Sequence, residues 1–249
     1  MARRVRILGV EVDAVTMAEA VATIDETIDA RRGHGGLPLQ VATVNPEFVM
    51  LARRDSAFRR ALKGAGLETP DGVGLMLAAR ILGHRLPSRV TGVELVRNLA
   101  ATAVGRGDRV FFLGAAPGVG AAAAAALALE YPGLPIAGEF GGVPGEEGDA
   151  ETVAAVRAAG SDIVLVAYGA PGQELWLERN LEVCGASVGI GVGGTFDYLA
   201  GRVKRAPAWM RRIGLEWLYR LAQQPSRARR MAVLPVFLLL VIRQRLMGW

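Results

Sequence analysis

Short apolar runs alternate with longer segments of helical pattern along most of this sequence, and that alternation limits the folds available to the chain. Residues 109–113, 162–168 and 187–192 read as buried strands, and a glycine-rich turn follows each of them. Strands that alternate with helices form a mostly parallel sheet with helices on both faces. The sequence therefore predicts an α/β core over residues 1–200.

The remaining elements follow from local signals. Two Thr-x-x-Glu capping boxes, at Thr16 and Thr91, mark helix starts. Further strands are predicted at 5–10, 39–44, 66–70 and 134–138. Helices are predicted at 17–30, 47–53, 56–63, 75–82, 92–104, 121–131, 149–159 and 174–182.

Ligand sites in such folds lie beyond the carboxyl ends of the strands, where five loops of this sequence fall. These loops are 43–45, 71–74, 114–120, 169–174 and 191–195. Glycine in such loops lets backbone N–H groups approach a phosphate closely. No loop has the spacing of a dinucleotide-binding or Walker motif, which argues against an NAD-type dehydrogenase on the same fold.

Asp71 is the sharpest candidate for catalysis, because it stands between Pro70 and Gly72 at a predicted strand end. The alternative is that it only caps the next helix. The sequence has no Asp-x-Asp pair, so arginines and amides would have to neutralise a diphosphate ligand. With two histidines and one cysteine, a zinc cluster is not expected, and no metal site is predicted.

Four other polar positions are candidates for ligand binding. Thr43 and Asn45 alternate along one strand, so both could face one ligand, although turn chemistry also explains them. Gln173 and Asp197 could instead be capping residues. Arg89 could instead pair with a surface acid, which is a weak contact.

The segment 201–249 differs from the rest of the chain in charge. It has eleven basic residues and one acid, Glu216, a balance of +10, whereas the whole chain is +5 and residues 1–200 are therefore −5. It also holds three of the four tryptophans and a twelve-residue apolar run, 231–242. These features together are typical of a segment that lies on an anionic membrane surface. A nucleic-acid patch or a solvated charge run is the alternative, but the apolar run would be costly to expose.

The apolar run is too short for a membrane-spanning helix, which needs roughly 20 residues, and Pro235 interrupts it. The N-terminus has no long apolar stretch, so no signal peptide is expected. The single cysteine, Cys184, fits a reducing compartment. We expect a cytoplasmic protein that docks peripherally on the inner face of the plasma membrane.

Several short motifs then occur in one order. They are Thr43-x-Asn45, Asp71-Gly-x-Gly74, Arg89-x-Thr-Gly92, Gly169-x-Pro-x-Gln-Glu174, Gly193-Gly-Thr-Phe-Asp-Tyr-Leu-Ala-Gly201, Arg205-Ala-Pro-x-Trp209 and Gly214-Leu-Glu-Trp-Leu-Tyr-Arg220. As an ordered set they resemble the WecG/TagA/CpsF family of bacterial glycosyltransferases, over about residues 5 to 230.

That resemblance implies a Rossmann-like core and a basic, helical C-terminal appendage, residues 201–249, that completes the active site. It implies inverting, metal-independent transfer of a sugar, typically N-acetylmannosamine, from a UDP donor to a polyprenyl-diphosphate-linked sugar. The products would be cell-surface polysaccharide or teichoic acid. No cofactor beyond the UDP-sugar is implied; nucleic acid is not an expected partner, and a homo-oligomer is left open.

The resemblance also implies roles for individual residues. Asp71 matches the catalytic base, and Thr43, Asn45, Arg89 and Gln173 match substrate-binding residues of the pocket; Asp197, in the fifth motif, is a further substrate-binding candidate. Arg220, Arg227 and Arg230 (or its neighbour Arg229) match the arginines of the appendage. Gly172 departs from the family, which often has a basic residue there. The runner-up is a non-catalytic peripheral membrane module that binds nucleotide or anionic lipid, in which Asp71 would be dispensable.

Overall fold

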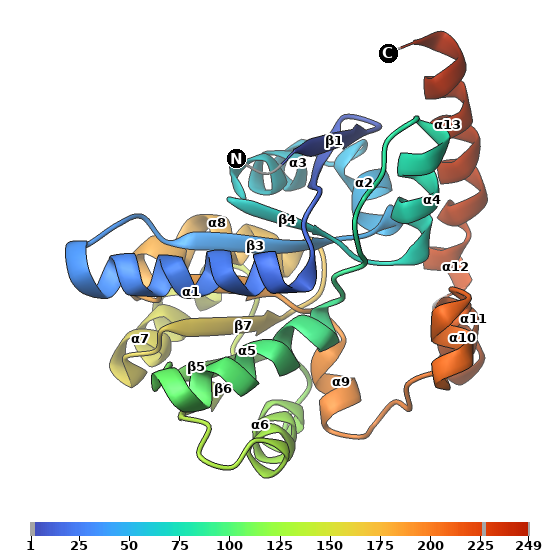
Figure 1. Cartoon of the computed structure of the whole chain (residues 1–249). Coiled ribbons are helices and arrows are strands. Elements are labelled where there is room, and N and C mark those ends of the chain that lie inside the picture. Colours follow the sequence, from blue (N-terminus) through green and yellow to red (C-terminus); the bar gives the residue numbers. More distant parts are fainter. Residues whose placement is uncertain (1–2, 226–227, 249) are drawn as a thin grey trace.

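The computed structural model describes residues 3–225 and 228–248, and it has a six-stranded, all-parallel sheet at its centre (Figure 1). The strand order is β4-β3-β8-β7-β5-β6. This confirms the predicted α/β fold with a parallel sheet. The strands are β3 (Leu39–Val44), β4 (Leu67–Pro70), β5 (Val110–Gly114), β6 (Ile136–Phe140), β7 (Ile163–Ala167) and β8 (Val188–Gly191).

Helices cover both faces of the sheet because side chains alternate along each buried strand. In β5, Val110 and Phe112 point into one core cluster and Phe111 and Leu113 into another. The first cluster is covered by α1 (Met17–His34), α5 (Gly92–Arg106), α6 (Val119–Glu130) and α9 (Thr195–Leu199). The second is covered by α7 (Asp149–Ala159) and α8 (Gly172–Cys184).

A third cluster lies beside β3 and β4, under α2 (Pro46–Ala52), α3 (Ser56–Gly64) and α4 (Val73–Ile81). The remaining helix of the core is a short 3-10 turn at Glu146–Gly148.

The two predicted capping boxes have different outcomes. At Thr16 the box is complete, because Thr16 accepts from the Glu19 N–H while the Glu19 carboxylate accepts from the Thr16 N–H. At Thr91 the hydroxyl accepts from the Glu94 N–H over 3.4 Å, but the Glu94 carboxylate pairs with Arg205 from the appendage. The second capping box is therefore only half formed, and the Glu94 carboxylate instead forms an ion pair with Arg205, which is distant in sequence.

The single strand predicted at 5–10 is wrong. The segment is an antiparallel hairpin of β1 (Arg4–Ile7) and β2 (Val10–Asp13), turned at Leu8 and Gly9. Both turn residues have positive φ, 49° and 90°, and Gly9 adopts such an angle without strain. A continuous apolar-rich stretch concealed the turn, because only one glycine marks it.

The predicted helical appendage is confirmed. Figure 1 shows α10 (Ala208–Arg212), α11 (Glu216–Gln223), α12 (Ala228–Met231) and α13 (Val233–Met247) along one side of the core. The helix α13 packs against α2 and α4 and buries Phe237 and Val241. Gln244 adds a hydrogen bond from the Leu8 N–H to its side-chain oxygen, 2.9 Å long. The division of the chain at residue 200 stays a prediction.

The apolar run 231–242 therefore has one buried face and one exposed face. Its inner face belongs to the third cluster, while Val236, Leu239 and Ile242 are exposed on the outer face, together with Leu246 one turn further on. Leu239 is 67% exposed, whereas Phe237 is 1% exposed. Among the described helices, none combines the length and apolar character that crossing a bilayer requires. Trp249 lies outside the described residues.

Candidate functional site

A cavity of about 470 Å³ opens at the carboxyl ends of β3, β4, β7 and β8, where the appendage faces the core. Its size is in the range of small-molecule sites. Residues from four of the five predicted loops line it: 43–45, 71–74, 169–174 and 191–195. The loop 114–120 does not line it, because β5 lies toward the far edge of the sheet.

Thr43 and Asn45 both line the cavity, as their alternation on one strand predicted. Each also has a structural bond. The Thr43 hydroxyl donates to the Gly191 carbonyl over 3.0 Å, which ties β3 to the last residue of β8. Asn45 accepts from the Phe48 N–H over 3.0 Å and so caps α2. This is local backbone bonding of the kind that the turn alternative invoked for Asn45, and it leaves the amide nitrogen available to a ligand.

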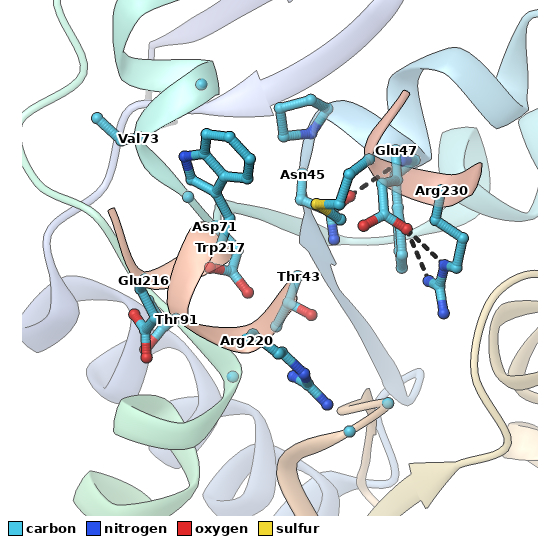
Figure 2. Close-up of a pocket in the computed structure, with 18 of the residues that line it drawn as sticks. Thr43, Asn45, Glu47, Asp71, Val73, Thr91, Glu216, Trp217, Arg220 and Arg230 are labelled. Carbon is cyan, nitrogen blue, oxygen red and sulfur yellow. Dashed lines mark hydrogen bonds and ion pairs between the residues drawn. The ribbon is translucent and has the colours of Figure 1, made fainter. Parts of the chain in front are cut away.

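Asp71 does not cap the helix that follows it. The N-cap of α4 is Gly72, with φ of 91° and no side-chain capping bond. Instead, Asp71 lies in the wall of the cavity, where the N–H of Gly92, the first residue of α5, helps to lower the pKa of its carboxyl group. The Asp71 N–H donates to the Val44 carbonyl over 2.7 Å, which fixes the turn. Figure 2 shows Asp71 together with Trp217 and Arg220 from the appendage around this cavity.

The surroundings of Asp71 raise its pKa to about 7, from an ordinary value near 4. Burial is the largest cause, since it disfavours the charged form. The guanidinium of Arg89 and the Gly92 N–H lower the pKa, while the carboxylates of Glu216 and Glu94 raise it. A carboxyl group with a pKa near neutrality can accept a proton from a substrate at physiological pH.

Arg89 lines the same cavity, with one nitrogen 3.5 Å from the Arg211 carbonyl of the appendage. Its positive charge lowers the pKa of Asp71. The candidate cation and the candidate base therefore line one cavity and influence each other electrostatically.

Gln173 is almost completely buried, and its side-chain oxygen accepts from the Gly169 and Gly193 N–H groups at 3.1 and 2.9 Å. The amide nitrogen donates to Glu174 over 2.6 Å, and burial raises the pKa of that carboxyl to about 8. Gln173 thus holds two cavity loops together, rather than capping a helix. A Cβ on Gly191 would collide with these two side chains, which explains the glycine there.

Arg220 enters the cavity from α11, and its guanidinium carbon lies 4.5 Å from the ring centre of Tyr198. One of its terminal nitrogens is buried without a hydrogen-bond partner in the described part of the chain, although it lies 3.9 Å from the Asp197 carboxylate. A Cβ on Gly194 would collide with this guanidinium. A buried, under-satisfied arginine beside a glycine turn is suited to an anionic group of a ligand.

Asp197 itself does not line the cavity. Its carboxylate lies 3.9 Å from a terminal nitrogen of Arg220, which gives it an indirect place in the site. Arg230 does line the cavity, and it forms an ion pair of 2.7 Å with Glu47, drawn in Figure 2. Arg227 lies outside the described residues, so its predicted role stays a prediction.

One side of the cavity is apolar, and the sequence did not predict it. This side comes from α4, α11, α12 and α13, whose apolar side chains line the same cavity as the polar residues. A cavity with one polar and one apolar side can hold a ligand that joins a charged group to a hydrocarbon chain. The apolar residues are Val73, Leu77, Trp217, Leu221, Met231, Leu234, Phe237 and Leu238.

Two acids of the cavity, Glu47 and Glu216, were also missed as site residues. Glu47 follows the Asn-Pro pair at the end of β3, and Glu216 lies within the motif from which only Arg220 was selected.

Across residues 3–225 and 228–248, the structure has no group of three His, Cys, Asp or Glu side chains arranged to hold a metal ion.

Comparison with known proteins supports the predicted resemblance. A family model described as "Glycosyl transferase WecG/TagA/CpsF family" matches residues 5–249. A protein of Bacillus subtilis (strain 168) is 36% identical over 206 residues, which are 82% of this chain and 79% of that protein. A protein of Staphylococcus aureus (strain MRSA252) is 33% identical over 235 residues, 94% of this chain and 91% of that protein.

Both relatives are named N-acetylglucosaminyldiphosphoundecaprenol N-acetyl-beta-D-mannosaminyltransferase. The match covers the parallel-sheet core that positions Asp71 and the appendage that brings Arg220 into the same cavity. These findings support a glycosyltransferase over a non-catalytic membrane module. The chain therefore belongs to the WecG/TagA/CpsF family of glycosyl transferases.

Proposed function

We propose that this protein transfers N-acetylmannosamine from a UDP donor to N-acetylglucosamine linked through diphosphate to a polyprenol. The relatives' printed names describe this transfer, apart from the UDP carrier. The observation that carries the proposal is Asp71, a carboxyl with a pKa raised to about 7, in a cavity that also holds the buried Arg220 guanidinium.

The proposed reaction is a direct displacement. The acceptor hydroxyl attacks the anomeric carbon, the bond from that carbon to the diphosphate oxygen breaks, and UDP leaves with the electron pair. Asp71 takes the proton of the attacking hydroxyl. One displacement needs one carboxylate and inverts the anomeric centre, so an α-linked donor gives a β-linked product. The β configuration in the relatives' names agrees with that outcome.

Arginines are proposed to stabilise the departing diphosphate in place of a metal ion. Within the part of the chain that the structure describes, one buried nitrogen of Arg220 has no hydrogen bond, and Arg89 lines the same cavity. Arg230 could turn from Glu47 toward a diphosphate, because its side chain is half exposed. Donors placed in advance where negative charge develops favour the transition state over the ground state.

The apolar side of the cavity is proposed to receive the first part of the polyprenyl chain. It adjoins the appendage, whose exposed large apolar side chains include Trp209, Ile213 and Leu239. Exposed aromatic and aliphatic groups beside many arginines favour an anionic membrane surface. We therefore place the protein peripherally on the cytoplasmic face of the membrane, where a lipid-linked acceptor would lie.

The test is an assay of the full-length protein with a panel of UDP-sugars and a short-chain polyprenyl-diphosphate N-acetylglucosamine. UDP-N-acetylmannosamine should give a disaccharide on the lipid with release of UDP, and omitting the acceptor should leave the donor nearly intact. Transfer from another sugar nucleotide in its place, or donor hydrolysis that does not depend on the acceptor, would contradict the proposal.

A further inference from the structure

A second cavity, of about 540 Å³, is lined by the β1–β2 hairpin, by α3 and by the edge strand β4 (Figure 1). Its size is in the range of small-molecule sites, and it shares no lining residue with the cavity that holds Asp71. Four cations and two acids line it, a balance of +2: Arg6, Arg59, Arg60, Lys63, Glu11 and Glu68. The second cavity is therefore a separate space with a positive lining.

Glu68 gives this cavity a buried carboxyl group. It is the second residue of β4, and only 2% of its surface is exposed. Its N–H donates to the Asp13 carboxylate over 2.8 Å, which fixes β4 to the hairpin. Within residues 3–225 and 228–248, one oxygen of the Glu68 carboxyl group is buried without a hydrogen-bond partner. Such an atom is costly for folding, so its presence calls for an explanation.

The cations of the hairpin bind other acids. Arg4 lies 2.9 Å from the Asp13 carboxylate and 2.9 Å from the Glu11 carboxylate. Arg6 lies 3.2 Å from Glu11. The hairpin therefore neutralises its own acids and leaves Glu68 without an ion pair in the described part of the chain.

Burial raises the pKa of the Glu68 carboxyl group to about 8. At neutral pH the group is therefore mostly uncharged, and it does not repel an anion in the same cavity. A neutral carboxyl group both donates and accepts hydrogen bonds, so it can bond with a hydroxyl group.

The cations of α3 complete the lining. The helix buries Phe58 and Leu62 in the core, whereas Arg59, Arg60 and Lys63 are exposed and line the cavity. Among the described residues, none of these three side chains has an ion pair. Arg59 and Lys63 are four residues apart, a spacing at which like charges destabilise a helix. An anion in the cavity relieves that repulsion.

We propose that the second cavity binds a small molecule that carries both a phosphate and hydroxyl groups, of the class of sugar phosphates and nucleotides. The cations of α3 bind the phosphate through charge-assisted hydrogen bonds. Glu68 binds a hydroxyl group, which is the partner that its buried oxygen lacks. This site goes beyond the proposed transfer reaction, because Glu68 is near the amino end of β4 and Asp71 follows the carboxyl end.

The experiment measures binding to the full-length protein by isothermal titration calorimetry. The probes are inorganic phosphate, ribose 5-phosphate and UMP. Arg59→Gln combined with Lys63→Gln removes two cations at exposed positions of the cavity. The matched control is Arg53→Gln combined with Arg54→Gln, because these residues are also exposed but do not line the cavity. Arg220→Ala identifies any binding in the first cavity.

Wild type should bind ribose 5-phosphate saturably and more tightly than inorganic phosphate. The Arg59/Lys63 double variant should bind it about tenfold more weakly or worse, because hydrogen bonds between charged groups are lost. The control and Arg220→Ala should bind it as wild type does. Comparing UMP with ribose 5-phosphate in Arg220→Ala then assigns the site: tighter binding of UMP indicates a nucleotide, and weaker binding a sugar phosphate.

Glu68→Leu tests the buried carboxyl group. It should abolish the preference for ribose 5-phosphate over inorganic phosphate. It should not lower Tm, because it replaces a buried oxygen that has no partner by apolar atoms of similar size. The inference would be overturned if none of the three probes bound saturably, or if the Arg59/Lys63 variant bound ribose 5-phosphate as wild type does. Loss of that binding in Arg220→Ala would also overturn it. All three results are independent of sugar transfer, so they are distinct from failure of the proposed function.

Discussion

The packing of α13 against the core can be tested with two substitutions on one helix. Phe237 is 1% exposed, in the cluster that also contains residues of α2 and α4. Leu239 is two residues further along α13 and is 67% exposed. Phe237→Ala should therefore remove a buried ring and leave a cavity, whereas Leu239→Ala should remove a side chain that already faces solvent.

The expected magnitudes differ strongly. A buried Phe→Ala substitution costs about 3–5 kcal/mol. For a chain of this size, each kcal/mol lowers Tm by about 2–4 °C, so Phe237→Ala should lower Tm by about 6–20 °C. Leu239→Ala should change the free energy of unfolding by no more than about 0.5 kcal/mol, as is usual for surface substitutions.

The assay is thermal and urea unfolding of both variants in detergent-free buffer, with hydrogen exchange across residues 233–247. The same proteins are then pelleted with anionic vesicles. There the order should reverse, because Leu239→Ala removes an exposed apolar group while the fold is kept. Equal and small losses of stability for the two variants would refute the packing of α13, and so would a larger loss in Leu239→Ala.

Four further predictions concern the cavity. Because Asp71 must be unprotonated to act as base and its pKa is raised to about 7, kcat/KM should fall about tenfold per pH unit below pH 7; a flat profile down to pH 5 would contradict this assignment. Because folding raises the pKa of Asp71, the free energy of unfolding of wild type should fall as pH rises from about 4 through 7. Asp71→Asn removes the charge that is costly to bury, so it should unfold at a higher temperature than wild type at pH 8 but not at pH 4. Arg220→Ala should lower kcat about 10²–10³-fold, because it removes one group that stabilises developing charge. Its circular dichroism spectrum and its vesicle binding should be retained. EDTA should leave wild-type turnover largely intact, and an absolute need for added Mg²⁺ or Mn²⁺ would count against arginines as the diphosphate ligands.

The sequence predicted the sheet and most of the cavity because both depend on local patterns. Apolar runs mark β5, β7 and β8, and the carboxyl ends of parallel strands meet at one edge. Thr43 and Asp71 follow from that rule together, since β3 and β4 are paired neighbours. The turn between β1 and β2 was missed because a two-residue turn with one glycine is a weak signal in an apolar stretch.

Contacts between distant segments were the least predictable. The sequence predicted that the apolar run would lie on a membrane, yet one face of it packs against α2 and α4. Nothing local distinguishes Phe237 from Leu239, because both are large apolar residues in one run. Glu94 was predicted to close a capping box, but Arg205, 111 residues away in sequence, takes its carboxylate. Such pairings depend on how the appendage docks, which periodicity does not encode.

The most direct test of the central claim is sugar transfer by wild type and Asp71→Asn, measured with equal saturation by UDP-N-acetylmannosamine. The substitution keeps the shape of the side chain and removes its ability to take a proton, so donor binding should be preserved. The account predicts that turnover falls by about 10²–10⁴-fold and that the wild-type product is β-linked. Turnover of Asp71→Asn near the wild-type rate, with the same donor affinity, would contradict it.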